Sequence, residues 1–301
     1  MSDHGASRER VSNVGILLRA GFFLLIVRVA GGVFGWFFHG MFDAGDYVTL
    51  LSSVISIFAA AALASTFVVR IYERGRLEDI GMGWSPVSGR HFWKGAVAGA
   101  VAALFVVCAG AAMGFLTWEK SADPATAFTL GRLVLVGALL LFGAVGEELM
   151  FRGYAFQLLI GAFGPWIVIP GFAVLFALPH LLNPNAWWLG MLNTGVWGIL
   201  LGYTMWRSGA LWMPIGLHFG WNFLLPLSGA RLSGFALSLH TYELKSKAAP
   251  WLSGGEYGPE GSALTTVACA LLMMWLWRSR LERQPSLLLR EEPELEEEPV
   301  P

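Results

Sequence analysis

Apolar residues fill most of this chain in long runs, and short polar segments separate the runs. Runs of roughly 18 or more apolar residues are typical of helices that cross a membrane. A membrane β-barrel would show short segments of alternating polarity, and these do not dominate. The pattern therefore predicts an all-α protein, a polytopic membrane bundle of about eight transmembrane helices. We expect the spans at about 14–38, 48–69, 94–117, 127–160, 165–182, 187–206, 210–227 and 263–279.

The polar segments indicate how the chain is oriented. Five Lys and Arg residues lie in the 70–94 segment, and further arginines precede the first span and follow the last. An even number of spans places these segments on one side, which the positive-inside rule assigns to the cytoplasm. We divide the chain into a polar cytoplasmic N-terminus (1–13), a transmembrane domain (14–280) and an acidic tail (281–301) that we expect to be disordered.

Composition supports a membrane protein and excludes other classes. The chain is 55% hydrophobic and 14% charged, with a mean hydropathy of +0.59, whereas soluble domains average about 25% charged residues. The net charge of −1 gives no sign of nucleic-acid binding. Cys108 and Cys269 lie in apolar runs without a disulfide or metal-binding pattern, so we interpret them as small buried hydrophobic residues. We expect an integral protein of a bacterial inner (plasma) membrane, with both termini cytoplasmic.

Three pairs of glycines stand four residues apart within the expected spans: Gly95 and Gly99, Gly198 and Gly202, and Gly216 and Gly220. Small residues at this spacing let two membrane helices approach closely. They predict tight crossings at three places, although so glycine-rich a chain also produces such pairs by chance.

A few polar residues lie within the apolar runs, where a charge at the centre of a membrane helix costs about 2.5–3.5 kcal/mol. Such side chains usually face the protein interior or a wet cavity. Helical spacing puts Glu148 and Arg152 on one face, where they can pair, and turns Glu147 about 100° away. The set comprises Glu147, Glu148 and Arg152 in the fourth span, His180 in the fifth, and His218 and Asn222 in the seventh.

These groups suit hydrolysis if three helices bring them together. A buried glutamate beside another carboxylate can take and give a proton near neutrality. Histidine can hold a water molecule, and His218 with Asn222 can donate hydrogen bonds to an oxyanion. The same Glu147, His180 and His218 could instead bind zinc, although the HExxH motif of soluble metalloproteases is absent.

Structural roles are open for each group taken alone. Glu148 and Arg152 could be a structural ion pair, His180 could bond a backbone carbonyl, and His218 with Asn222 could clasp two helices. The interpretation as a site depends on three patterns, EExxxR, FxxxH and HxxxN, which occur in this order and each in its own apolar span.

The ordered motifs are Glu147-Glu148-Leu-Met-Phe-Arg152, Phe176-Ala-Leu-Pro-His180 and His218-Phe-Gly-Trp-Asn222. This set resembles the CAAX protease and bacteriocin-processing family of intramembrane endopeptidases, also called the Abi family. All motif positions match, and they span a core of residues 147–222.

The resemblance implies a helical membrane fold and hydrolysis of a peptide bond in a membrane-associated protein or peptide. Some members of the family cleave prenylated CAAX proteins. On the family's glutamate-type mechanism, Glu147 and His180 would activate water. His218 and Asn222 would form the oxyanion hole, and Glu148 and Arg152 would support the site. We favour this metal-free mechanism, with no cofactor, over a zinc mechanism.

Two other functions remain open from the sequence. The chain could be a non-catalytic membrane scaffold or a bacteriocin-immunity protein. A transporter is less favoured, because no inverted repeat or paired broken helices are visible.

The expected spans also pose a geometric problem, since His180 stands near the end of its helix and Glu147 near the middle of a long one.

Overall fold

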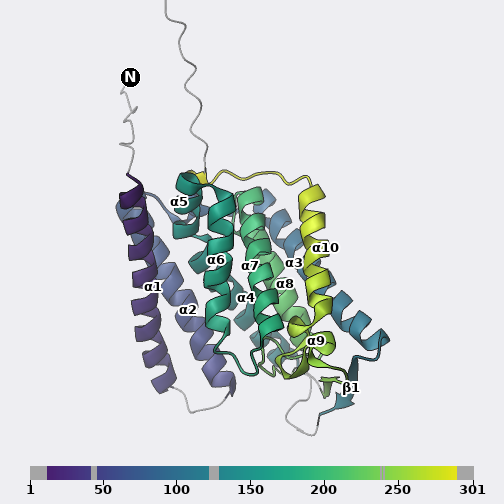
Figure 1. Cartoon of the computed structure of the whole chain (residues 1–301). Coiled ribbons are helices and arrows are strands. Elements are labelled where there is room, and N and C mark those ends of the chain that lie inside the picture. Colours follow the sequence, from purple (N-terminus) through teal and green to yellow (C-terminus); the bar gives the residue numbers. More distant parts are fainter. Residues whose placement is uncertain (1–11, 42–45, 122–128, 238, 240, 290–301) are drawn as a thin grey trace, which may run out of the picture.

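The structure, a computed structural model, describes residues 12–41, 46–121, 129–237, 239 and 241–289. This part of the chain is mainly helical, as the apolar runs predict, and most of its helices lie side by side in one bundle (Figure 1). The main helices are α1 (Asn13–Met41), α2 (Asp46–Val68), α3 (Pro86–Ala112), α4 (Leu130–Arg152), α5 (Tyr154–Phe163), α6 (Pro165–His180), α7 (Trp188–Ser208), α8 (Trp212–Leu227) and α10 (Ala263–Arg278).

Single helical turns and two short strands connect these helices. The strands β1 (Leu116–Lys120) and β2 (Tyr242–Ser246) pair antiparallel, with Leu116 opposite Ser246. The turns are η1 (Val69–Glu73), η2 (Leu77–Ile80), α9 (Pro250–Ser253), η4 (Gly255–Tyr257), η5 (Pro259–Gly261) and η6 (Leu287–Leu289).

The expected number of about eight spans is not confirmed. Within the described residues, four helical segments are long and apolar enough to cross a membrane: Asn13–His39, Leu51–Glu73, Pro86–Ala112 and Leu130–Phe163. The helices α6 and α10 are apolar but have only 16 residues each, about 24 Å at the α-helical rise. The chain is therefore a helical membrane protein in which some apolar helices are shorter than a standard span.

The expected fourth span, residues 127–160, is not one continuous helix. It breaks at Gly153, whose φ of −75° and ψ of −133° are not helical. A Cβ at this position would collide with the carbonyl oxygen of Leu149, so the break requires glycine. The helix α4 therefore ends at Arg152, and Glu147 stands near its end rather than in its middle. Glu147 and His180 line one cavity, so the expected mismatch in depth between them is not present.

The glycine pairs on α3 and α8 pack against each other. A Cβ at Gly99 would collide with the Leu217 carbonyl oxygen, and one at Gly220 with that of Ala96. On α7, a Cβ at Gly198 would lie 2.7 Å from the Cα of Ala173 in α6. The close crossings predicted from the sequence are present, and they hold α8 deep in the bundle.

The segment after the last helix differs from its prediction. Residues 281–289, expected within the disordered tail, pack on the bundle: Leu289 is buried, and Ser286 donates a hydrogen bond to the buried Gln157. Arg90 contacts Glu282 at 2.9 Å, which joins the start of α3 to this segment. The rest of the tail (290–301) and residues 1–11 lie outside the described residues.

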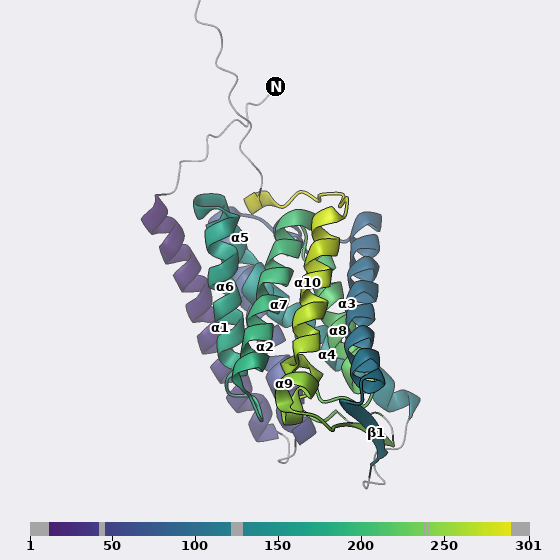
Figure 2. The same cartoon turned by 45° about the vertical axis from the view of Figure 1, so that its right-hand side comes forward.

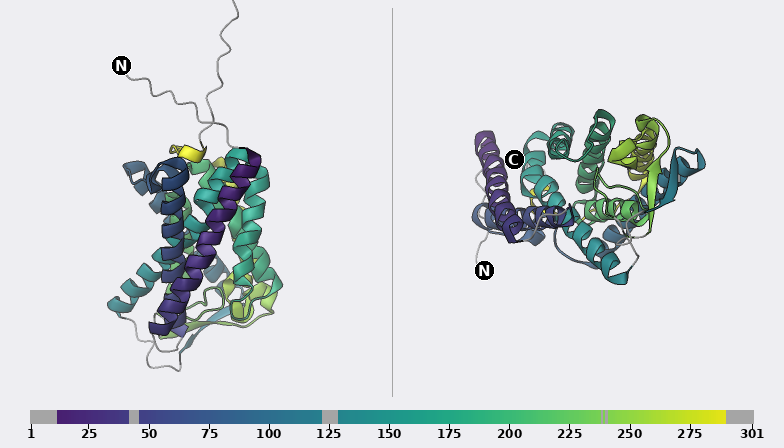
Figure 3. Two further views of the ribbon diagram at one scale, coloured as in Figure 1. Left: turned by 90° about the vertical axis from the view of Figure 1, so that its left-hand side faces the viewer. Right: turned by 90° about the horizontal axis from the view of Figure 1, so that it is seen from below.

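The two ends of the bundle differ in what they carry. The start of α1, the start of α3 and the segment after α10 lie at one end, and the β1–β2 pair lies at the other (Figures 1 and 2). This arrangement agrees with an even number of crossings between the first and last described residues. Seen along the bundle in Figure 3, α1 stands at one edge.

Candidate active site

A cavity of about 310 Å³ opens among α2, α4, α6, α7, α8 and the segment between α8 and α10. Apolar side chains such as Ile57, Leu140 and Phe235 form much of its wall. Its ionisable or amide-bearing lining includes Glu147, His180, Asn183, His218, Asn222 and Glu260. Four of the six residues predicted from the motifs therefore share one cavity.

Glu147 faces this cavity from α4. The preceding Gly146 lets α4 approach α2, because a Cβ there would lie 2.8 Å from the Cα of Phe58. The Oε2 atom of Glu147 lies 3.8 Å from Nε2 of His218 and has no hydrogen-bond partner among the described residues. Glu147 thus presents a free carboxylate oxygen beside an imidazole.

Glu148 and Arg152 form the ion pair that their spacing predicts, and both side chains are fully buried. Arg152 Nη1 donates to Glu148 Oε1 at 3.2 Å, and Nη2 donates to the Gly198 carbonyl of α7 at 3.0 Å. The guanidinium also lies over the ring of Phe176, 4.5 Å from its centre. Arg152 therefore links α4 to α6 and α7 behind the cavity.

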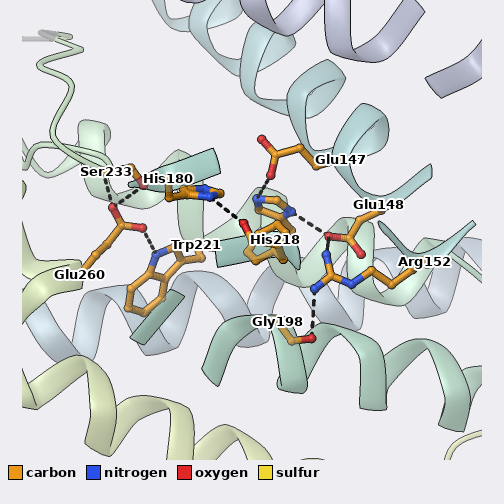
Figure 4. Close-up of polar contacts among 10 residues, drawn as sticks. Glu147, Glu148, Arg152, His180, Gly198, His218, Trp221, Ser233 and Glu260 are labelled. Carbon is orange, nitrogen blue, oxygen red and sulfur yellow. Dashed lines mark hydrogen bonds and ion pairs between the residues drawn. The ribbon is translucent and has the colours of Figure 1, made fainter. Parts of the chain in front are cut away.

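His218 contacts the carboxylates of both glutamates, which the sequence reasoning did not foresee. Its Nδ1 lies 2.9 Å from Glu148 Oε1, while its Nε2 faces Glu147 (Figure 4). Because Glu148 is paired with Arg152 and accepts, Nδ1 donates to it. Glu148 therefore fixes the orientation of the His218 ring in addition to pairing with Arg152.

His180 ends α6 and lines the same cavity. Its Nδ1 lies 2.9 Å from the carbonyl oxygen of Phe176, which can only accept, so Nδ1 carries a proton. In the neutral ring, Nε2 is then free to accept a hydrogen bond. The centre of the Phe176 ring lies 5.1 Å from that of His180 and 6.0 Å from that of His218. Phe176 therefore packs against both imidazole rings.

Asn222 lies one turn beyond His218 on α8 and lines the cavity. The structure thus brings Glu147, His180, His218 and Asn222 to one space and puts Glu148 and Arg152 directly behind His218. The catalytic roles of these residues stay predictions.

Sequence reasoning missed Glu260, which enters the cavity from η5 in a segment without a recognised motif. Trp221 Nε1 donates to its Oε1 at 3.1 Å, and the backbone N–H and the hydroxyl of Ser233 both donate to its Oε2. Asn193 of α7 donates to its backbone carbonyl at 2.7 Å. No spacing rule links Glu260 to the other site residues, because three separate segments meet only in the folded chain.

The environment of Glu260 acts on its acidity in two directions. Burial raises the pKa of this carboxyl above its usual value, and the hydrogen bonds from Trp221 and Ser233 offset part of that rise. All of these side-chain contacts are donors, which is the set that an ionised carboxylate accepts.

The residues named for a zinc site do not form a compact ligand set. Across the described ranges, no group of three His, Cys, Asp or Glu side chains is close enough to hold a metal ion. Glu147, His180 and His218 line one cavity without converging on a point, so we derive no step through a metal.

Comparison with known proteins supports the resemblance seen in the motifs. Residues 129–224, about a third of the chain, match the family model described as type II CAAX prenyl endopeptidase Rce1-like. The match includes α4 to α8 and all six predicted site residues, and it confirms the resemblance over this segment. No curated protein and no solved structure matches the chain.

Proposed function

We propose that this protein is an intramembrane endopeptidase that hydrolyses a peptide bond in a membrane-associated protein or peptide. The observation that carries the proposal is the shared cavity of Glu147, His180, His218 and Asn222, backed by the buried Glu148–Arg152 pair. The family match over residues 129–224 supports the same reaction class.

Glu147 and His180 activate the water molecule. The free Oε2 of Glu147 takes a proton from water, and Nε2 of His180 accepts the other water hydrogen and fixes the direction of attack. The oxygen attacks the carbonyl carbon, and Glu147 then passes its proton to the departing amine as the C–N bond breaks. One water is consumed, and the products are a carboxylic acid and an amine.

His218 and Asn222 stabilise the negative oxygen of the tetrahedral intermediate. The amide of Asn222 donates directly. His218 donates from Nε2 when both ring nitrogens carry protons, and its contact with the Glu148 carboxylate at 2.9 Å stabilises that positive charge. Arg152 holds Glu148 in place, so the donor direction of His218 is set before substrate arrives.

The substrate reaches this site within the membrane. The apolar cavity wall suits a lipidated or hydrophobic segment, and a prenylated CAAX-type protein is one such substrate. We place both termini in the cytoplasm of a bacterial inner membrane, following the Lys and Arg residues of the 70–94 segment. The mechanism that we favour uses no metal.

The test is a cleavage assay on the purified protein in detergent, with prenylated and unmodified peptides. Glu147→Gln keeps the size of the side chain but cannot take a proton, so we expect cleavage to fall by about 100-fold or more. The Glu282→Gln variant, altered at an exposed carboxylate outside the cavity, should cleave normally.

Three results would overturn this proposal or parts of it. Full activity of Glu147→Gln would remove Glu147 from the mechanism. Activity lost with a zinc chelator and restored by zinc would replace the metal-free mechanism with a metal site at Glu147, His180 and His218. If the wild-type protein cleaves no peptide in the panel, a non-catalytic scaffold or immunity protein becomes the better interpretation.

A further inference from the structure

The cavity holds a second carboxylate that the proposed reaction does not use. Figure 4 shows Glu260 on the other side of His180 from Glu147, and both glutamates line the cavity. Trp221, Ser233 and Asn193 hold Glu260 from α8, from the segment after it and from α7. These contacts hold Glu260 in one position. Its side chain is partly exposed and lines the cavity.

The charges of the cavity are not balanced by basic side chains. Arg152 matches the charge of Glu148 behind the wall. Glu147 and Glu260 remain, and among the described residues no Lys or Arg lines the cavity; His180 and His218 are its basic groups. The carboxylate of Glu260 therefore has no Lys or Arg partner among the described residues that line the cavity, and it attracts a cation.

Glu260 also keeps capacity to accept another hydrogen bond. Its Oε1 receives one bond, from Trp221, and a carboxylate oxygen accepts two. The long stem of a lysine or arginine can lie along the apolar wall beside Leu140 and Leu201 while its charged end reaches a carboxylate. A glutamate or aspartate side chain would meet repulsion instead.

We propose that Glu260 is a specificity-determining residue whose carboxylate binds a basic side chain, lysine or arginine, of the peptide that occupies the cavity. The proposal rests on the proposed function only in taking a peptide as the occupant. It adds a preference that residues 147–222 do not encode, because Glu260 lies outside them.

Direct binding tests the proposal without relying on cleavage. The protein is the full chain carrying Glu147→Gln, purified in detergent, and binding is followed by fluorescence anisotropy. The probes are labelled peptides that place lysine, glutamine or glutamate at each position in turn. We expect lysine at one position to improve the Kd about tenfold or more over glutamine, as a charge-assisted hydrogen bond does. Adding Glu260→Gln should abolish this difference while the glutamine peptide binds as before.

Two control variants separate charge from structure. Ser233→Ala removes one hydrogen bond to Glu260 but keeps its charge, so the lysine preference should persist. Glu256→Gln removes an exposed carboxylate of the neighbouring turn, paired with Arg231 at 3.2 Å, and should also leave the preference intact. If Glu260→Gln binds no peptide, Glu260→Asp decides, because it keeps the charge and must keep the preference.

The outcomes distinguish this inference from the proposed reaction. Equal binding of the lysine and glutamine peptides, or a preference that survives Glu260→Gln, overturns the role of Glu260. Failure of every lysine peptide to bind does the same. A lysine preference in a protein whose wild type cleaves nothing leaves Glu260 as a recognition residue and overturns only the endopeptidase.

Discussion

Single side chains behind the cavity decide how the candidate site is held. Arg152 is fully buried, and its contacts with Glu148 and the Gly198 carbonyl offset the cost of burying two charges. Glu148 in turn accepts a hydrogen bond from the Nδ1–H group of His218. These residues form one connected polar network, and a change in one member therefore reaches the others.

Arg152→Met should destabilise the protein. It removes the positive partner of buried Glu148 and the donor to Gly198, and breaking a buried pair in this way costs about 3–5 kcal/mol. The measurement is the midpoint of thermal unfolding in detergent, which should fall clearly. The matched control is Arg90→Met, since its ion pair with Glu282 is 63% exposed on both sides and is worth about 0–1 kcal/mol. Equal midpoints for the two variants would contradict the structural role of Arg152.

Close backbone contact at glycines positions the helix pair α3 and α8. The α3–α8 crossing depends on backbone contact at Gly95, Gly99, Gly216 and Gly220. Because His218 lies between the two glycines of α8, this crossing sets the distance of His218 from α4. The break at Gly153 similarly sets where α4 ends.

Gly220→Ala should disturb the crossing and the site together. The added methyl group would meet the Ala96 carbonyl oxygen, a backbone atom that cannot turn aside, and overpacking of this kind costs about 1–3 kcal/mol. We expect a lower unfolding midpoint and reduced peptide cleavage. Gly171→Ala on α6 is the control, because no atom lies within 4 Å of the added Cβ. An unchanged midpoint for Gly220→Ala would show that the helices do not meet as described.

At the scale of the whole molecule, the bundle has two unlike ends. Contacts such as Arg90–Glu282 and Gln284–Ser88 join the start of α3 to the segment after α10 at one end. The paired strands β1 and β2 and the segment that carries Glu260 close the other end, near the cavity. Part of the cavity wall, which includes Ser233, Phe235 and Glu260, therefore lies outside the motif core.

This arrangement predicts the labelling of cysteines by a membrane-impermeant maleimide. In a background with Cys108 and Cys269 replaced by alanine, Glu119→Cys on β1 should react in intact cells whose outer membrane has been permeabilised. Ser12→Cys and Arg280→Cys should react only after lysis, because Ser12 directly precedes α1 and Arg280 follows α10, at the end of the bundle that we propose to be cytoplasmic. Reaction of Ser12→Cys and Arg280→Cys on different sides of the membrane would contradict the fold.

Hydropathy and the 3.6-residue repeat are local properties, so sequence patterns predicted the helical membrane class, picked out the six motif residues and indicated the Glu148–Arg152 pair. They also indicated the glycine crossings. They did not settle the number of spans, because apolar helices such as α6 have only 16 residues and are shorter than a standard span.

Packing between distant segments produces the link from Glu148 to His218, the shared cavity of Glu147 and His180, and the entry of Glu260 into that cavity. Each depends on contact between segments far apart in sequence: 70 residues separate Glu148 from His218, and 39 separate Trp221 from Glu260. No local periodicity encodes such contacts, since they arise only when the helices pack.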